Sequence, residues 1–190
     1  MPSVPPTTIT IDGVAVPVEV AGPDTGSVVV LLSAAHQAPA AYAAVCERLH
    51  TASLKTVVIG PDPRLTAKSV IGVLDELDVR WALVVGDRLG AELAWELAAT
   101  RLDRFIGLVA IDRGHPRVAD LAGVIRDENC PPVELNTTAL VSTTAARAVA
   151  KASQRFVYGD YRIVELLARR NVADSTAQLA AEIVMRTSTW

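Results

Sequence analysis

The chain has 190 residues, of which 51% are apolar and 21% are charged, with 18 basic and 21 acidic side chains. This length supports one domain with its own core, and the composition excludes a disordered, collagen-like or low-complexity chain. The net charge of −3 gives no basic footprint that would indicate a nucleic-acid partner. We therefore expect residues 1–190 to form a single domain.

The N-terminal residues and the cysteines bear on location. The first residues, MPSVPPTT, contain neither the basic nor the apolar region of a signal peptide. The longest stretch without a charged side chain, Thr25 to Cys46, changes character halfway, which predicts a strand, a turn and a helix instead of a membrane span. Cys46 and Cys130 are too few for a disulfide framework, so we expect reduced thiols and a cytoplasmic protein. Only three of the 18 basic residues are lysines, which indicates a bacterial genome rich in GC, and the mean hydropathy of +0.32 favours an oligomer.

The first structured segment is expected to be a hairpin. Residues Thr7 to Val20 alternate polar and apolar side chains around Asp12-Gly13, a dipeptide typical of tight turns. The run from Ser27 to Leu32 is then continuously apolar and rich in β-branched residues, which predicts a strand buried on both faces.

Strands and helices alternate through the middle of the chain. Apolar residues at spacings of three and four predict three helices, and Thr66 is placed to cap the second. Their apolar positions are Tyr42, Val45, Cys46 and Leu49; Val70, Ile71, Leu74 and Leu77; and Leu89, Leu93, Ala94 and Leu97. The strands that follow each helix are Thr56 to Ile59, Trp81 to Val85, and Phe105 to Ile111. This order predicts an α/β fold: a doubly wound, mostly parallel sheet with helices on both faces.

The C-terminal part continues the alternation after a polar, Pro-rich loop from Arg113 to Glu134. Two further strands are expected, at Thr138 to Ser142 and at Tyr161 to Leu166, with an Ala-rich segment between them. A capping box formed by Ser175 and Gln178 is expected to open the last helix. Its inward residues are Leu179, Ala180, Ile183 and Val184.

A sharp turn joins the strand at Trp81 to Val85 to the third helix. It reads Gly86-Asp87-Arg88-Leu89-Gly90, and it resembles the nucleophile elbow G-x-S-x-G of the α/β-hydrolase superfamily. There the glycines leave room for a strained turn that directs the central residue into the pocket. The central residue here is Arg88, where the family has Ser, Asp or Cys.

The resemblance covers most of the chain. The hairpin is similar to the family's first two strands, SVVVLLSAAHQAP to its third strand and oxyanion loop, and KTVVIGPD to its fourth strand. FIGLVAIDRGHP, TTALVS and YRIVEL are similar to the sixth, seventh and eighth strands. The resemblance implies a minimal member of the fold without a cap domain, because only a short loop around Asp120 to Pro132 stands where a cap is usually inserted.

The triad of the family is not matched. Arg88 cannot act as a nucleophile, because its guanidinium stays protonated. The family's His is expected after the eighth strand, but residues 166–172 contain none, and Arg170 or Asn171 stands in its place. Ser142-Thr143-Thr144 occupies the segment where the acid often lies. A non-catalytic protein, a pseudo-hydrolase, is therefore the leading interpretation.

Three residues remain as alternative catalytic groups. Asp87 lies one place before the centre of the elbow, so a salt bridge or turn hydrogen bond is the structural alternative for it. Asp112 ends a strand at the carboxyl edge of the sheet and, with His115, could perform acid–base chemistry. Its structural alternative is to neutralise Arg88 or Arg113. An enzyme with such a rebuilt site would act on esters or thioesters.

A ligand-binding role is expected at the elbow and the oxyanion loop. Arg88 and Leu89 lie at a helix N-terminus, where free N–H groups favour anions. The oxyanion loop adds donors at Ala34 and Ala35, and His36 lines the pocket or caps the next helix. With Asp112, these residues form the predicted site for a small anionic or acyl ligand or for a protein partner. The alternative is that Arg88 and Asp112 pair and fill the pocket, leaving a structural or assembly component. No metal site and no cofactor are predicted, since the three histidines lack ligand spacing.

Overall fold

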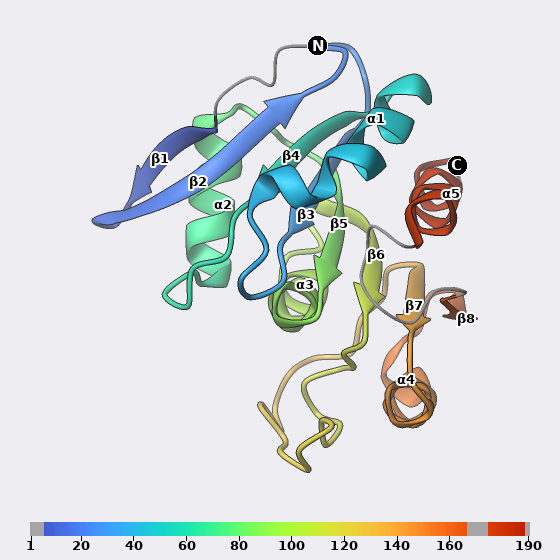
Figure 1. Ribbon diagram of the computed structural model, residues 1–190. Helices are drawn as coiled ribbons and strands as arrows, with labels where there is room; N and C mark the ends of the chain where they lie inside the picture. The colour runs from blue at the N-terminus through green and yellow to red at the C-terminus, as the bar shows by residue number, and fades with distance from the viewer. Residues whose placement is uncertain (1–5, 167–174, 189–190) are drawn as a thin grey trace.

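One eight-stranded sheet runs through the molecule in the computed structural model, which describes residues 6–166 and 175–188. The strands are β1 (Thr7–Ile11), β2 (Val14–Ala21), β3 (Val28–Leu32), β4 (Lys55–Ile59), β5 (Ala82–Asp87), β6 (Phe105–Ile111), β7 (Thr137–Val141) and β8 (Tyr161–Glu165). Their order across the sheet is β1-β2-β4-β3-β5-β6-β7-β8. The β1–β2 and β2–β4 pairs are antiparallel and all the others are parallel. The predicted mostly parallel sheet with an N-terminal hairpin is confirmed (Figure 1).

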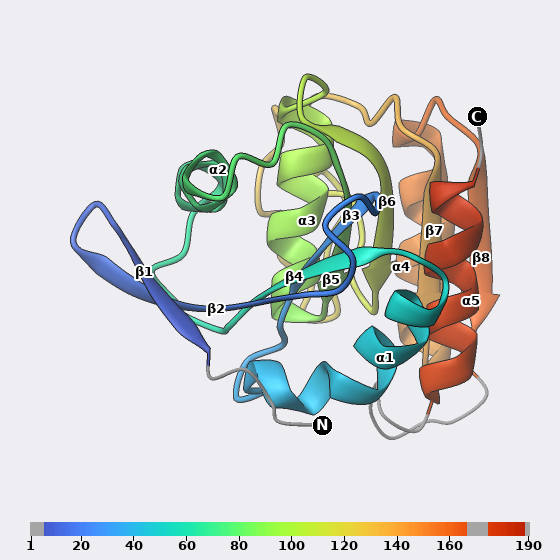
Figure 2. The same ribbon diagram turned by 90° about the horizontal axis from the view of Figure 1, so that it is seen from above.

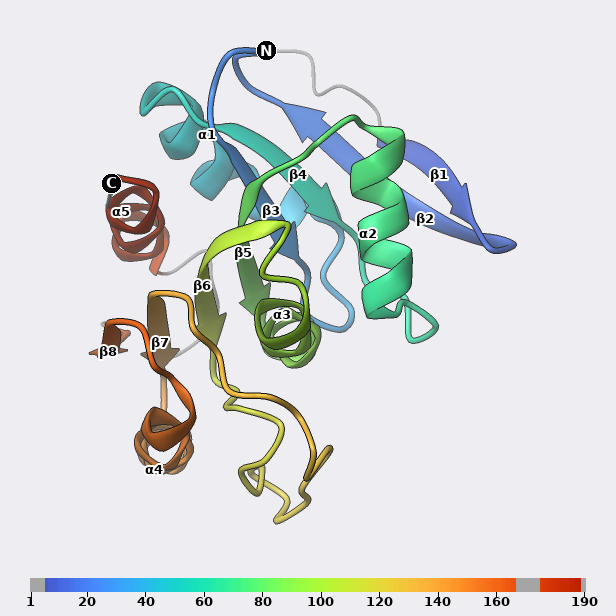
Figure 3. The same ribbon diagram turned by 180° about the vertical axis from the view of Figure 1, so that it is seen from behind.

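Helices cover both faces of this sheet, as predicted. They are α1 (Ala43–Thr51), α2 (Ala67–Glu76), α3 (Leu89–Thr100), α4 (Thr144–Ser153) and α5 (Thr176–Thr187), with short 3-10 turns η1 (Pro39–Tyr42) and η2 (Gln154–Phe156). Figure 2 shows α1 and α5 on one face, and Figure 3 shows α2, α3 and α4 over the other. Alternate residues of β3 reach the two cores: Val29 and Leu31 pack under α1 and α5, and Val30 and Leu32 under α2 and α3. The continuously apolar strands are thus explained by burial on both sides.

Of three local features predicted from the sequence, the hairpin turn and the cap of α2 are confirmed, and the capping box of α5 is not. Asp12 and Gly13 have φ values of 49° and 80°, the left-handed pair that a tight hairpin turn requires. Thr66 caps α2 in a reciprocal capping box with Ser69. The predicted box at the start of α5 is wrong, because the Ser175 side chain makes no capping hydrogen bond and the Gln178 amide donates to the Glu165 carbonyl oxygen at 2.7 Å. Gln178 therefore ties α5 to the end of β8.

Helix α3 buries the predicted face except at its first residue: Ala94 and Leu97 are fully buried and Leu93 packs against the core, whereas Leu89 does not. Its innermost side chain is Trp95, which is fully buried and donates its indole N–H to the Arg113 carbonyl oxygen at 3.0 Å. Leu89, by contrast, is 42% exposed. The small residues Gly90, Ala91 and Ala94 take the inner positions because the helix begins hard against β3 and β5. Leu89 is thereby left facing outward, and the partly buried Leu93 lies one turn further along the same side of the helix.

The segment between β6 and β7 is a long loop. Residues 112–136 are all described, and they contain no helix, so no cap domain follows β6. The loop projects past α3 and α4 in both Figure 1 and Figure 3. Leu121, Val124 and Ile125 are exposed on it. Within the described residues, no helix has the length and apolar character needed to cross a membrane.

Candidate functional site

The turn between β5 and α3 has the geometry of an elbow. Strand β5 ends at Asp87, α3 begins at Leu89, and Arg88 between them has φ 50° and ψ −104°, a conformation that side-chain-bearing residues rarely adopt. A Cβ at Gly90 would collide with the carbonyl oxygens of Leu32 and Ser33. The glycine frame therefore lets α3 start directly against β3, and it holds Arg88 at the carboxyl edge of the sheet.

The side chain of Arg88 turns back onto the neighbouring carboxylate. Its Nε and one terminal nitrogen donate to the two oxygens of Asp87 at 3.1 and 3.3 Å. The Asp87 side chain is 1% exposed, whereas that of Arg88 is 37% exposed. The hydrogen bonds that the guanidinium donates to Asp87 hold the pKa of Arg88 above its usual value. Asp87 thus forms a salt bridge, the structural alternative that the glycine frame favoured.

A buried tyrosine completes this network. The Tyr42 hydroxyl donates to Asp87 at 2.8 Å and accepts the Ala34 N–H at 2.9 Å. Burial and the nearby charge of Asp87 raise the pKa of Tyr42 well above its usual range, so its proton stays in place as a donor. The backbone donor expected for an anion at Ala34 is consequently bonded inside the protein.

Asp112 does not pair with Arg88 or Arg113, so that structural alternative is wrong. Its two carboxylate oxygens accept from the Ser142 backbone N–H at 2.7 Å and from the Ser142 hydroxyl at 2.5 Å. Arg113 instead pairs with Glu92 at 3.1 Å. Asp112 therefore joins the carboxyl ends of β6 and β7, and its charge reaches Arg88 only as a minor influence that raises the arginine's pKa.

His115 bonds to other groups than Asp112. Its side chain is fully buried, stacks on Phe156 with ring centroids 4.9 Å apart, and has both ring nitrogens bonded to backbone. Nε2 lies 2.8 Å from the Pro131 carbonyl oxygen, and Nδ1 accepts the Arg117 N–H at 3.2 Å. Because Nδ1 accepts and Nε2 faces an acceptor, the ring is the neutral Nε2–H form. Burial lowers the pKa of His115. The Asp112–His115 acid–base pair expected as an alternative is not formed.

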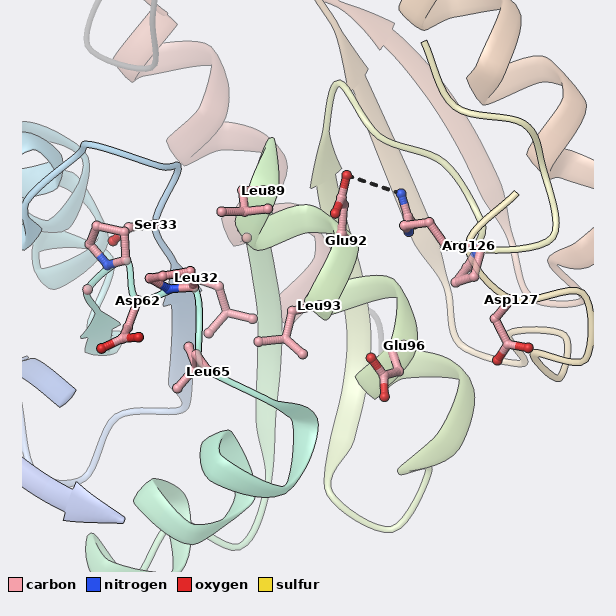
Figure 4. Close-up of a pocket in the computed structure, with 15 residues that line it drawn as sticks. Leu32, Ser33, Asp62, Leu65, Leu89, Glu92, Leu93, Glu96, Arg126 and Asp127 are labelled. Atoms are coloured by element: carbon pink, nitrogen blue, oxygen red, sulfur yellow. Dashed lines mark ion pairs between the residues drawn. The ribbon is translucent and has the colours of Figure 1, made fainter. Parts of the chain in front are cut away.

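Beside the elbow lies an open cleft of about 540 Å³ (Figure 4). Its walls come from the ends of β3 and β4, the outward face of α3 and the loop after β6. Apolar and ionisable side chains line it, among them Asp62, Leu65, Leu89, Glu92, Leu93, Glu96, Arg126 and Asp127. Of the predicted site residues only Leu89 lines this cleft. Ala35 and His36 are exposed but lie outside its lining, as do Ala34, Arg88 and Asp112.

The arrangement of these elements is shared with solved structures. A hydrolase from Pseudomonas aeruginosa PA01 superposes with a TM-score of 0.77 over 97% of this chain and 98% of that one, at 15% identity. Epoxide hydrolase VrEH1 from Vigna radiata gives 0.75 over 99% of each chain at 12% identity. The enol-lactonase from Burkholderia xenovorans LB400 gives 0.73 over 96% of this chain and 100% of that one at 15% identity. The chain has the α/β-hydrolase fold. No family sequence model and no curated protein matches it by sequence.

The resemblance to the α/β-hydrolase superfamily places the family's His at a position where this chain was expected to carry Arg170 or Asn171. It falls in the segment after β8, and residues 167–174, including Arg170 and Asn171, lie outside the described residues. Among the residues that are described, no group of three or more His, Cys, Asp and Glu side chains is placed to hold a metal ion.

Sequence reasoning missed most of the cleft. Glu92 and Glu96 on α3 stand four residues apart beside Leu89 and Leu93, and that double row was a usable signal for one wall. The opposite walls come from residues 60–65 and 116–127, which are distant in the chain. No local pattern could have brought them together.

Proposed function

We propose that this chain is a non-catalytic protein on the α/β-hydrolase fold and that it binds a small ligand in the cleft beside the elbow. The ion pair between Arg88 and buried Asp87 carries the proposal. It places a permanently protonated side chain where the fold's enzymes hold a nucleophile, and it bonds that side chain to the nearest carboxylate.

Two further contacts support the same conclusion. The Ala34 N–H, which the resemblance identifies as an oxyanion donor, is bonded to Tyr42. His115, the nearest histidine after β6, has both ring nitrogens bonded to backbone groups. Acyl transfer needs a nucleophile, a base and an oxyanion donor together; Arg88 at the elbow is no nucleophile, His115 is bonded to backbone groups, and the Ala34 N–H is bonded to Tyr42.

The cleft fits an apolar or acyl ligand better than an anion at Arg88. Arg88 is already neutralised by Asp87, and its side chain is outside the cleft lining. Leu65, Leu89 and Leu93 supply an apolar floor. A volume of about 540 Å³ lies within the range of small-molecule sites, roughly 300–1,000 Å³.

One observation favours the hydrolase alternative. The Ser142 hydroxyl is hydrogen-bonded to Asp112 at the carboxyl edge, so a rebuilt site would use Ser142 as the nucleophile and Asp112 as its base. A different observation favours an assembly role: the exposed Leu121, Val124 and Ile125 present an apolar surface that a protein partner or a second copy could cover.

Turnover of p-nitrophenyl esters and of a short acyl thioester tests the proposal, with Arg88→Ala and Ser142→Ala measured beside the unaltered protein. We expect all three proteins to stay at the buffer background. Saturable turnover that disappears in Ser142→Ala would establish the rebuilt hydrolase. Turnover that disappears in Arg88→Ala would mean that the arginine stabilises a developing oxyanion, and either result would overturn the non-catalytic proposal.

A further inference from the structure

The cleft combines an apolar floor with carboxylates along one side. Leu89 and Leu93 are four residues apart on α3, so they follow one row of the helix, and Figure 4 shows both at the middle of the cleft. Glu92 and Glu96 form the next row of the same helix. A ligand whose apolar part rests on the leucines therefore has acidic side chains immediately beside it.

The charges of the lining are mostly negative. The ionisable side chains that line the cleft are Asp62, Glu92, Glu96, Arg126 and Asp127. Two of these carboxylates are neutralised by the protein itself. Glu92 pairs with Arg113 at 3.1 Å and with Arg126 at 3.3 Å, and Asp62 pairs with Arg64 at 2.9 Å. Arg126 is the one cation among these five lining side chains, and it is bonded to Glu92, so the printed lining carries four negative charges against one positive charge.

Glu96 and Asp127 are different. Neither takes part in an ion pair within residues 6–166 and 175–188. Both side chains line the cleft, from α3 and from the loop after β6, and both are exposed. One Asp127 oxygen accepts the Asn129 backbone N–H at 2.9 Å, which leaves the charge of the carboxylate in place. An anionic ligand would bring a further negative charge into a cleft that already holds these two carboxylates, whereas a cation would be attracted by both.

We propose that the cleft binds a small organic cation, a protonated amine carried on an apolar body. The inference rests on the proposed function and names the chemistry of its ligand. The ammonium group pairs with Glu96 and Asp127, and the apolar body covers Leu65, Leu89 and Leu93. The sequence analysis predicted an anionic ligand at Arg88, whereas this inference places a cationic ligand in the cleft. Probes of opposite charge therefore distinguish the two hypotheses.

Three six-carbon probes of different charge test the inference: hexylammonium, hexanol and hexanoate. Binding is followed at pH 7 by chemical-shift changes in the ¹⁵N-labelled full chain, at low salt and at 1 M NaCl. We expect hexylammonium to bind at least tenfold more tightly than hexanoate at low salt, with hexanol between them. The preference should shrink at high salt, because the carboxylates are exposed and screened.

Matched variants locate the effect. Glu96→Gln with Asp127→Asn should abolish the preference for hexylammonium. Glu47→Gln with Glu76→Gln removes the same charge from exposed positions on α1 and at the end of α2, and should leave the preference intact. Leu93→Asp, which places a charge on the floor, should weaken hexanol binding.

Each other outcome is decisive. Equal binding of the three probes, weakened by Leu93→Asp, would overturn the cationic ligand and leave the cleft as a binding site. Tighter binding of hexanoate, lost in Arg88→Ala, would overturn the inference and move the ligand to the elbow. Absence of binding by all three probes would overturn both the inference and the proposed cleft.

Discussion

The elbow before α3 and the outward side of α3 itself differ in how their polar side chains are bonded. At the elbow, Arg88, Asp87 and Tyr42 bond to one another and to the Ala34 N–H, and the carboxylate at the centre is 1% exposed. Less than three helical turns away, Glu96 lines an open cleft and has no cationic partner among residues 6–166 and 175–188. The same edge of the sheet thus holds a polar centre whose groups bond to one another and, beside it, a cleft with a carboxylate that is not in an ion pair among the described residues, so the geometry of the elbow does not mark where an open charge lies.

The largest expected effect comes from breaking the glycine frame of the elbow. Gly90→Ala would press a Cβ against the Leu32 and Ser33 carbonyl oxygens, so either α3 or β3 must move. We expect a loss of more than about 3 kcal/mol in the free energy of unfolding, measured by urea denaturation. Gly123→Ala is the control: its φ of 82° is unfavourable for alanine, but no atom lies within 4 Å of the new Cβ, so its cost should be nearer 1 kcal/mol, an order-of-magnitude figure. Similar losses for both variants would contradict a tightly packed elbow.

Removing the buried charge at the elbow ranks next. Asp87→Asn keeps the shape of the side chain but leaves Arg88 without its anion and sets an amide against two donors. A loss of about 2.5 kcal/mol is expected, less than for a fully buried pair, because the unpaired Arg88 is 37% exposed and partly screened by water. Asp103→Asn breaks the exposed pair with Arg101 and should leave the free energy of unfolding nearly unchanged. If Asp87→Asn is equally harmless, the buried ion pair does not hold the elbow together.

A smaller loss is expected when the tyrosine link is cut. Tyr42→Phe removes the acceptor of the Ala34 N–H and one donor to Asp87, leaving a buried donor unsatisfied. The expected cost is about 2 kcal/mol in chemical denaturation. Tyr158, which is 70% exposed, supplies the comparison, and Tyr158→Phe should change stability by less than about 0.5 kcal/mol. Equal effects would show that the Tyr42 hydroxyl is replaced by water.

The smallest effect concerns the loop that forms one cleft wall. His115 is buried in its neutral form, with a pKa lowered from the ordinary 6.5 by burial. The folded state therefore binds fewer protons than the unfolded state, so this contribution to stability is complete above pH 6.5 and declines as the pH falls below it. His115→Gln should flatten the profile of unfolding free energy between pH 5 and pH 7.5, and the exposed His36→Gln should not. An unchanged slope in His115→Gln would contradict burial of the neutral ring.

The elbow itself could be predicted from the sequence because its cause is local. Gly86 and Gly90 fix the turn whatever the residue between them, and the strand and helix signals on either side are strong. The partner of Arg88 could not be predicted. Asp112 was expected to neutralise Arg88 or Arg113, and the salt bridge or turn hydrogen bond expected for Asp87 had no named partner. Adjacent side chains on a regular strand alternate between its two faces. The positive φ of Arg88 breaks that alternation and brings neighbours together.

The hydrogen bond of Tyr42 and the cleft could not be predicted, because both depend on contacts between distant segments. The spacing of Tyr42 with Val45 and Leu49 predicted a buried helix face, correctly, but burial says nothing about where a hydroxyl points. Its partner Asp87 lies 45 residues away. The cleft likewise needs three distant segments, so only the row of leucines and glutamates on α3 was visible beforehand.

Amide hydrogen exchange at Ala34 tests most directly whether the polar groups of the elbow are hydrogen-bonded to one another inside the protein. The account predicts that the Ala34 N–H exchanges as slowly as the core amides of β3 and that Tyr42→Phe accelerates it far more than it accelerates those core amides. Fast exchange of Ala34 in the unaltered protein, close to that of exposed Ala35, would show a free donor at the elbow and would contradict the account.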